Sequence, residues 1–199
     1  MECLAFRALG FNAFSADILP CTGGWPEYHY QGDAIGLMYA PGTFFSQHGE
    51  RYDVPRWDLV IAHPPCTYLT KAGAVHLFPN GQLNKDRAGK MADARRFFMM
   101  CYNAPTQFVA VENPIPLKCA QLPRPSCYVE PTWYGHQYSK KTLFWLRNLP
   151  PLMPTHCRQS EGSYLSHCAT TRRSKSFSGV AAAMAQQWGS YVCENLYPD

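Results

Sequence analysis

The run Trp57–Cys66, which reads WDLVIAHPPC, constrains the fold of this chain more than any other segment. Its apolar part is long enough for a buried strand, and Pro64 and Pro65 end the strand because proline cannot donate to a sheet and stiffens the turn that follows. Cys66 is therefore expected at the carboxyl end of a strand, where open α/β sheets place their ligands.

A second apolar run, 108–111, ends in Glu112, Asn113 and Pro114. A glutamate directly after a buried strand is costly to bury unless it has a partner or a task. A thiol and a carboxylate at two strand ends predict one active site. The alternative interpretations are that Cys66 is a small buried apolar residue and that Glu112 caps a turn.

Composition indicates one globular domain over residues 1–199, with 46% hydrophobic residues. No apolar stretch is long enough to span a bilayer and the N-terminus lacks a signal-peptide pattern, so we expect a cytoplasmic protein without a membrane partner. Nine irregularly spaced cysteines favour thiols over a disulfide framework. The net charge of +4 permits a nucleic-acid partner without requiring one.

Residue patterns predict an α/β three-layer domain with a mostly parallel sheet. Residues 147–175 are read as a small basic insertion within it. The predicted helices are 3–9, 87–102 and 178–196, with Gly10 ending the first and Ser178 as N-cap of the last. The predicted strands are 11–18, 28–33, 58–62, 107–111, 129–133 and 142–146. Residues 36–55 and 67–90 are predicted loops.

Several short motifs, in this order along the chain, resemble the DNA cytosine-5 methyltransferases, and the whole chain is most similar to a compact phage and bacterial branch of that family. The motifs are Asp17-Ile18-Leu19-Pro20, Gln31-Gly32-Asp33, Pro65-Cys66, Glu112-Asn113, Gly135-His136 with Ser139-Lys140-Lys141-Thr142, and Arg173-Ser174 with Phe177–Trp188. The resemblance implies a Rossmann-like fold and methyl transfer from S-adenosylmethionine to cytosine C5 in DNA. Protection from restriction is an expectation at the level of the family.

The resemblance also implies roles for single residues. Cys66 would attack cytosine C6, and Glu112 would contact N3 and the exocyclic amine of a base flipped out of the duplex. The implied cofactor contacts are Asp17 to the ribose, Asp33 to the adenine amine, Ile18 and Pro65 along the adenine, and Ser178. The candidates for phosphate contact are Lys71, Lys140, Lys141, Arg172 and Arg173. The alternative interpretation of each of these basic residues is a solvated position on the surface. The alternative for Asp17 and Asp33 is that each stabilises a turn or caps a helix.

The sequence departs from the family pattern at its start, where helix 3–9 is not preceded by the usual first strand and glycine loop. Three interpretations stay open: a displaced or truncated start, a last helix that fills the gap, and a methyl donor that is not used in the usual way. Residues 147–172 are short for a target-recognition domain, which predicts a short or relaxed sequence preference. His156-Cys157 and His167-Cys168 are adjacent pairs poorly spaced for zinc, so no metal is expected.

Two other functions stay open at this stage. One is a catalytically silent relative that binds DNA or a protein partner. The other is a cytosine C5-modifying enzyme that uses a different one-carbon donor or a free nucleotide.

Overall fold

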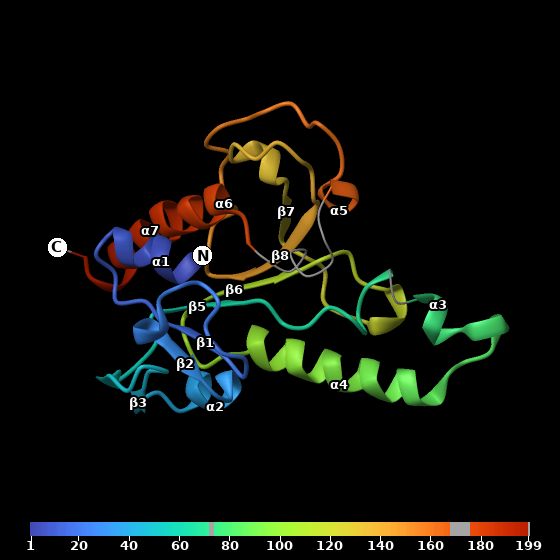
Figure 1. The fold of residues 1–199 in the computed structure, drawn as a ribbon, viewed down its shortest axis with the longest axis horizontal. Coiled ribbons are helices and arrows are strands. Elements are labelled where there is room, and N and C mark those ends of the chain that lie inside the picture. Colours follow the sequence, from blue (N-terminus) through green and yellow to red (C-terminus); the bar gives the residue numbers. More distant parts are fainter. Residues whose placement is uncertain (72–73, 168–175, 199) are drawn as a thin grey trace. The chain divides into compact units, whose positions relative to one another are not determined.

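The computed structural model describes residues 1–71, 74–167 and 176–198, and it shows a mixed α/β chain with small sheets (Figure 1). The chain divides into two compact units. Unit 1 comprises Met1–Leu59, Glu130–Lys140 and Leu152–Asp199, and unit 2 comprises Val60–Val129 and Lys141–Pro151. Among the described residues, no helix combines the length and the apolar character needed to cross a bilayer.

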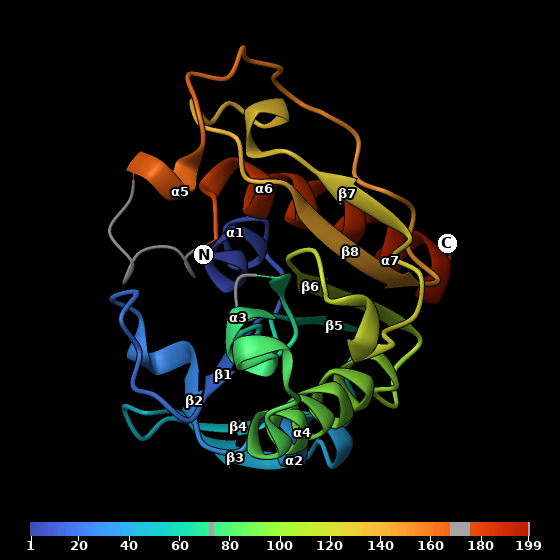
Figure 2. The ribbon, with the colours of Figure 1, turned by 90° about the vertical axis from the view of Figure 1, so that its right-hand side faces the viewer.

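Unit 2 is built on a four-stranded sheet whose order is β5-β6-β8-β7. The strands are β5 (Leu59–Ala62), β6 (Phe108–Asn113), β7 (Cys127–Val129) and β8 (Thr142–Arg147). Strand β8 pairs antiparallel with both β6 and β7, and β7 and β8 run side by side in Figure 2. The expected mostly parallel sheet is therefore wrong, and the sheets are mixed. Between β7 and β8 lies only the short helix η5 (Pro131–Trp133), whereas a parallel connection normally needs a full crossover helix.

The core of unit 2 forms where helix α4 (Lys85–Tyr102) packs on β6 (Figure 1). Phe98 of α4 is fully buried, and its ring meets the ring of Trp145 edge to face at a centroid distance of 5.0 Å. The indole nitrogen of Trp145 donates to the carbonyl of Pro123 at 2.8 Å, so its polar atom is satisfied inside the core. The smaller helices of unit 2 are α3 (Ala74–Leu77), η3 (Pro79–Gly81) and η4 (Lys118–Ala120).

Unit 1 contains two small two-stranded sheets and a group of packed helices. The parallel pair is β1 (Ser15–Asp17) with β2 (His29–Gln31), and the antiparallel pair is β3 (Thr43–Phe45) with β4 (Arg51–Asp53). The helices are α1 (Glu2–Ala8), η1 (Pro26–Tyr28), α2 (Ala34–Tyr39), α5 (Tyr164–His167), α6 (Ser178–Ala183), the π-helical η7 (Met184–Trp188) and α7 (Gly189–Leu196). Helix α1 packs against α6 and η7.

The sequence located most of these elements but missed the β3–β4 pair of unit 1. The predicted loop 36–55 holds the end of α2 and both strands of the β3–β4 pair. The aromatic rings of Phe44 and Tyr52 pack on Phe14, which supplies the apolar face that these short strands need. The predicted loop 67–90 holds α3, η3 and the start of α4, and the predicted strand 129–133 ends at Val129 because Pro131 begins a helix.

Gly179 offers a test of packing within unit 1. A Cβ atom added there would lie 1.9 Å from the carbonyl oxygen of Tyr134, which is backbone and cannot rotate away. We expect Gly179→Ala to lower the free energy of unfolding by about 3 kcal/mol or more, as overpacking does in rigid surroundings. Urea denaturation measures the loss. Gly89→Ala, in α4 with open space around the new methyl group, should instead be neutral or slightly stabilising.

Candidate active site

The ends of two neighbouring strands of unit 2 carry the predicted site. Strand β5 ends at Ala62 and leads into His63, and β6 continues through Glu112 and Asn113, two residues beyond the predicted end of that strand. Because β5 and β6 are adjacent in the sheet (Figure 1), both predicted functional tips belong to one edge of unit 2.

Two side-chain contacts hold these tips together. The Nδ1 atom of His63 lies 3.1 Å from Oε2 of Glu112, and the amide nitrogen of Asn113 donates to the carbonyl of Pro64 at 2.9 Å. The side chains of His63 and Glu112 remain 37% and 20% exposed, so this pair is accessible to a ligand. Asn113 and Pro64 are buried, and their hydrogen bond fixes the proline turn against β6.

Cys66 is half-buried at the end of this turn. Its carbonyl accepts hydrogen bonds from the backbone N–H groups of Leu69 and Thr70 at 3.0 and 3.2 Å, which closes a tight turn after the cysteine. Leu69 is fully buried, and its carbonyl accepts from the N–H of Leu117, beyond β6, at 2.7 Å. The backbone is therefore held on both sides of the Cys66 thiol, as a positioned nucleophile requires.

The sequence analysis did not anticipate His63 and Asn113 as members of the site. Both stand beside a predicted site residue along the chain, but nothing in the sequence states which side chains meet across two strands. Asn113 also has a buried amide oxygen that has no hydrogen-bond partner among the described residues. Such an atom is uncommon in a protein interior and is more often found at functional sites.

The predicted cofactor residues lie mainly at the β1–β2 pair of unit 1. Asp17 ends β1, and one of its carboxylate oxygens accepts from the N–H of Leu19 at 2.9 Å, while Asp33 caps α2 by accepting from the N–H of Ile35 at 3.0 Å. Both aspartates are exposed, and Ile18 beside Asp17 is 74% exposed. Carboxylate oxygens next to an accessible apolar side chain fit the hydroxyls and ring of a nucleoside.

The other two predicted cofactor residues stand elsewhere. Pro65 is an exposed residue of unit 2, next to Cys66. Ser178 is exposed in unit 1, but the prediction that it caps the last helix is wrong. The N-cap is Phe177, and Ser178 is already the first helical residue, so its hydroxyl does not take the capping position.

The described members of the predicted phosphate-contacting set are divided between the two units. Lys71 is exposed in unit 2 after the cysteine turn. The amino group of Lys140, in unit 1, lies 5.5 Å from the ring centre of Phe177, and that of Lys141, in unit 2, lies 4.0 Å from the ring centre of Tyr128. Arg172 and Arg173 lie outside the described residues, as does Cys168. Among residues 1–71, 74–167 and 176–198, no three histidine, cysteine or acidic side chains group together as metal ligands would.

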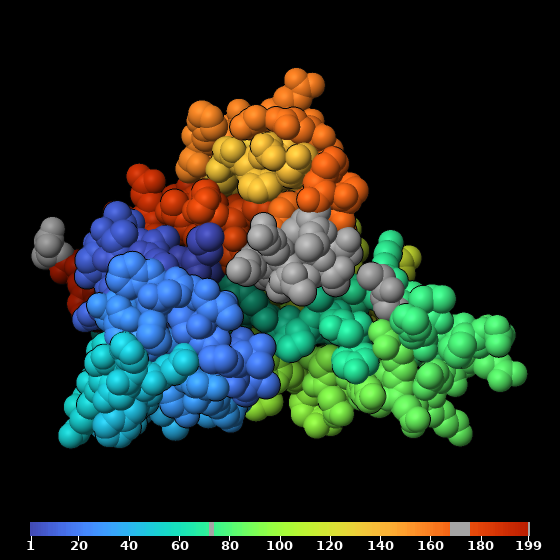
Figure 3. Space-filling model, viewed as in Figure 1, coloured from blue at the N-terminus to red at the C-terminus, as the bar shows by residue number. Residues whose placement is uncertain are grey.

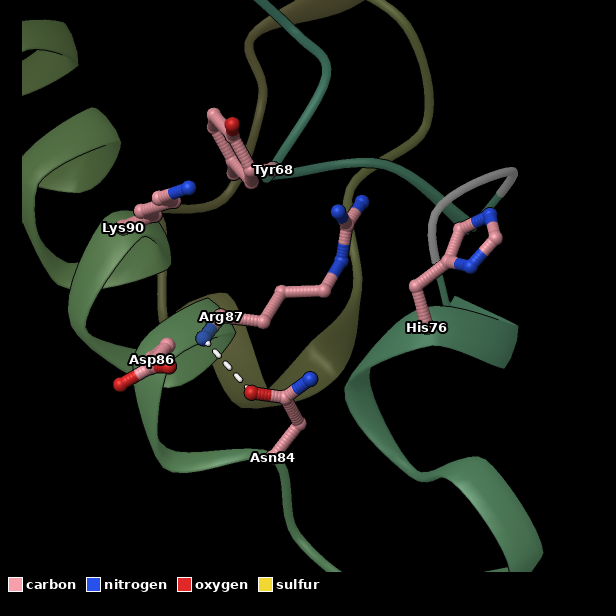
Figure 4. Close-up of a pocket in the computed structure, with 6 residues that line it drawn as sticks. All are labelled: Tyr68, His76, Asn84, Asp86, Arg87 and Lys90. Atoms are coloured by element: carbon pink, nitrogen blue, oxygen red, sulfur yellow. Dashed lines mark hydrogen bonds between the residues drawn. The ribbon is translucent and has the colours of Figure 1, made fainter.

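A pocket of about 410 Å³ opens beside the cysteine turn of unit 2 (Figure 4). The residues that line it are Tyr68, His76, Asn84, Asp86, Arg87 and Lys90. A guanidinium nitrogen of Arg87 donates to the carbonyl of Thr67, the residue after Cys66, at 3.1 Å. Six residues of the predicted loop 67–90 therefore line an open, basic hollow beside the start of α4.

None of the eight described cysteines forms a disulfide. They differ in burial, and we expect the more buried thiols to react more slowly. Desolvation raises the pKa of Cys101 to about 12 and that of Cys3 to about 11. At pH 8 only about one Cys101 in 10,000 is then a thiolate, the form that reacts. We expect iodoacetamide to label the exposed Cys119 and Cys157 well before Cys3 and Cys101 in the native protein, and labelling of Cys3 and Cys101 should rise with pH. Peptide mass spectrometry reads each site, and equal rates for all four would contradict this order.

No known protein-family model matches the chain, and a search of curated proteins gives no significant match either. The functional assignment therefore rests on the residues and geometry of the site itself.

Proposed function

We propose that this protein is a DNA cytosine-5 methyltransferase with Cys66 as nucleophile and Glu112 as the group that binds the pyrimidine edge. We further propose a Rossmann-like methyltransferase fold for the chain. The observation that carries the proposal is the pairing of the β5 and β6 tips, where a thiol on a fixed turn and a partly exposed carboxylate share one sheet edge. The order of motifs along the sequence supports it.

The chemistry suits these two groups. The Cys66 thiolate adds to cytosine C6 and breaks the C5–C6 double bond, so that electron density moves to C5 and the ring carbonyl. Glu112, as a carboxylic acid, stabilises this density by donating a hydrogen bond or proton at N3. Once C5 carries the methyl group, its proton is lost to water and the electron pair of the C5–H bond re-forms the C5–C6 double bond. The C6–S bond breaks in the same step, and its electron pair returns to sulfur as the thiolate.

His63 supports the role of Glu112. Its Nδ1 atom contacts Oε2 of Glu112, and such a contact fixes the rotamer of the glutamate. A carboxyl group has a second oxygen, which is the one that could face a base.

S-adenosylmethionine supplies an electrophilic methyl group when bound. In this chain Asp17 would hold the ribose hydroxyls, Asp33 would hold the adenine amine, and Ile18 would lie along the adenine ring. Both aspartates already use one oxygen for backbone N–H groups, which orients the carboxylate toward solvent at the ends of β1 and β2. Isothermal titration of the cofactor into Asp17→Asn tests this assignment without any methyl transfer.

A trapping experiment tests the function. The protein is incubated with a duplex oligonucleotide that contains 5-fluorocytosine, with and without S-adenosylmethionine, and covalent adducts are measured by denaturing electrophoresis and mass spectrometry. Fluorine at C5 cannot leave as a proton does, so an adduct at Cys66 that carries a new methyl group supports the proposal. An adduct that forms equally with and without S-adenosylmethionine and carries no methyl group would point to another one-carbon donor. DNA binding without any adduct would point to a silent relative. Either result overturns methyl transfer.

A further inference from the structure

We propose that the pocket formed by Tyr68, His76, Arg87 and Lys90 binds a phosphate group of the cytosine nucleotide on which Cys66 acts. The identity of the nucleotide rests on the proposed function, whereas the phosphate site rests on the pocket alone. The phosphate could belong to a DNA strand or to a free nucleotide, and the same side chains would serve both.

The pocket is assembled from three segments of unit 2. Tyr68 belongs to the turn after Cys66, His76 belongs to α3, and Arg87 and Lys90 rise from the first turns of α4 (Figure 4). The Arg87 guanidinium lies 4.9 Å and the Lys90 amino group 5.9 Å from the centre of the Tyr68 ring. One aromatic ring thus brings two cations to the same hollow.

The positive charge of the pocket is not compensated. Within the described part of the chain, neither Arg87 nor Lys90 pairs with a carboxylate. Asp86 also lines the pocket, but Figure 4 shows its carboxylate pointing away from the Arg87 guanidinium. Asn84 is engaged with the helix, because its side chain accepts from the backbone N–H of Arg87 at 3.1 Å. The hollow is therefore suited to an anion.

The donors favour a phosphate over a carboxylate or a halide. Arginine carries five N–H donors and lysine three, so the single hydrogen bond from Arg87 to Thr67 leaves capacity for several oxygens of one ligand. His76 also lines the pocket and can donate from a ring nitrogen. A tetrahedral anion with several acceptor oxygens uses such convergent donors better than a planar or spherical anion does.

The pocket is also linked to the nucleophile. Arg87 holds the carbonyl of Thr67, and Thr67 follows Cys66 directly. A phosphate bound by Arg87 and Lys90 would therefore lie beside the cysteine turn, where it could hold the nucleotide that carries the reacting base. The segment that bears α3 and the start of α4 is exposed on the face shown in Figure 3, where it is green.

The test compares Lys90→Gln with Lys85→Gln, which removes the same charge from the same helix but outside the pocket. Binding of a fluorescent duplex is measured by anisotropy between 50 and 200 mM NaCl, and binding of dCMP is measured by calorimetry. For Lys90→Gln we expect about fivefold to tenfold weaker binding and a slope of log K against log salt that is about one unit shallower. Lys90→Arg should restore most of the affinity, and urea midpoints confirm that the variants remain folded.

Each outcome decides a separate point. If Lys90→Gln and Lys85→Gln lose the same affinity, the effect is a general one of charge and the site is overturned. The site is also overturned if Lys90→Gln keeps its affinity for both the duplex and dCMP. If Lys90→Gln loses affinity for dCMP alone, the pocket binds a phosphate monoester. If it loses affinity for the duplex, the pocket binds the DNA backbone. If the wild type forms no adduct with 5-fluorocytosine but Lys90→Gln still lowers the slope, the phosphate site stands and the proposed function fails. If adducts form normally in Lys90→Gln with an unchanged slope, only the phosphate site fails.

Discussion

Replacing Cys66 by alanine is expected to abolish covalent trapping of 5-fluorocytosine DNA and to lower methyl transfer by more than about 1,000-fold. The reason is that the C6–S bond is the step that makes C5 reactive, and no other group at the two strand tips can form it. Cys66 is half-buried and its turn is held by backbone hydrogen bonds, so the loss of one sulfur atom should leave the fold intact. DNA affinity should change by no more than about threefold.

The matched control is Cys119→Ala, because Cys119 is an exposed cysteine of the same unit in η4. That variant should trap DNA at the wild-type rate. An adduct that persists in Cys66→Ala, or one that vanishes in Cys119→Ala, would remove Cys66 from the role of nucleophile. Mass spectrometry of the trapped peptide identifies the attached cysteine directly.

The strand tips were predictable from sequence because each depends on local pattern. The prolines after Ala62 end β5, and the apolar run before Glu112 forms the buried part of β6, where residues 108–111 are 0–2% exposed. Helix α4 was equally clear, since Phe98 and Cys101 recur at helical spacing and are the buried residues of that helix. In each case a short-range rule and the long-range packing agree.

The remaining features depend on contacts between distant parts of the chain. The antiparallel pairing of β8 with β6 joins residues 143–147 to 109–113. No local pattern states on which side of a sheet a strand adds or in which direction it runs. The β3–β4 pair has three-residue strands that become stable through the aromatic contacts around Phe14. The same limit applies to the site, where His63 finds its partner 49 positions away.

Glu112→Gln is the second change with a large expected effect, and it isolates the acid from the nucleophile. Glutamine keeps the length of the side chain and can still accept from His63 and contact a base, but it cannot deliver a proton at N3. We expect the rate of adduct formation to fall by about 100-fold to 10,000-fold, the range that a positioned general acid supplies. Quench-flow trapping with 5-fluorocytosine DNA measures the rate.

Two comparisons make the result specific to the carboxyl group. Glu194→Gln changes an exposed glutamate in α7 and should leave the rate unchanged. Iodoacetamide labelling of Cys66 in the absence of DNA should be nearly the same in Glu112→Gln and the wild type, because the acid is proposed to act on the base and not on the thiol. A parallel loss of labelling would mean that Glu112 positions or ionises Cys66 instead. A wild-type adduct rate in Glu112→Gln would remove the carboxylate from the chemistry and leave the His63–Glu112 contact as a purely structural link between β5 and β6.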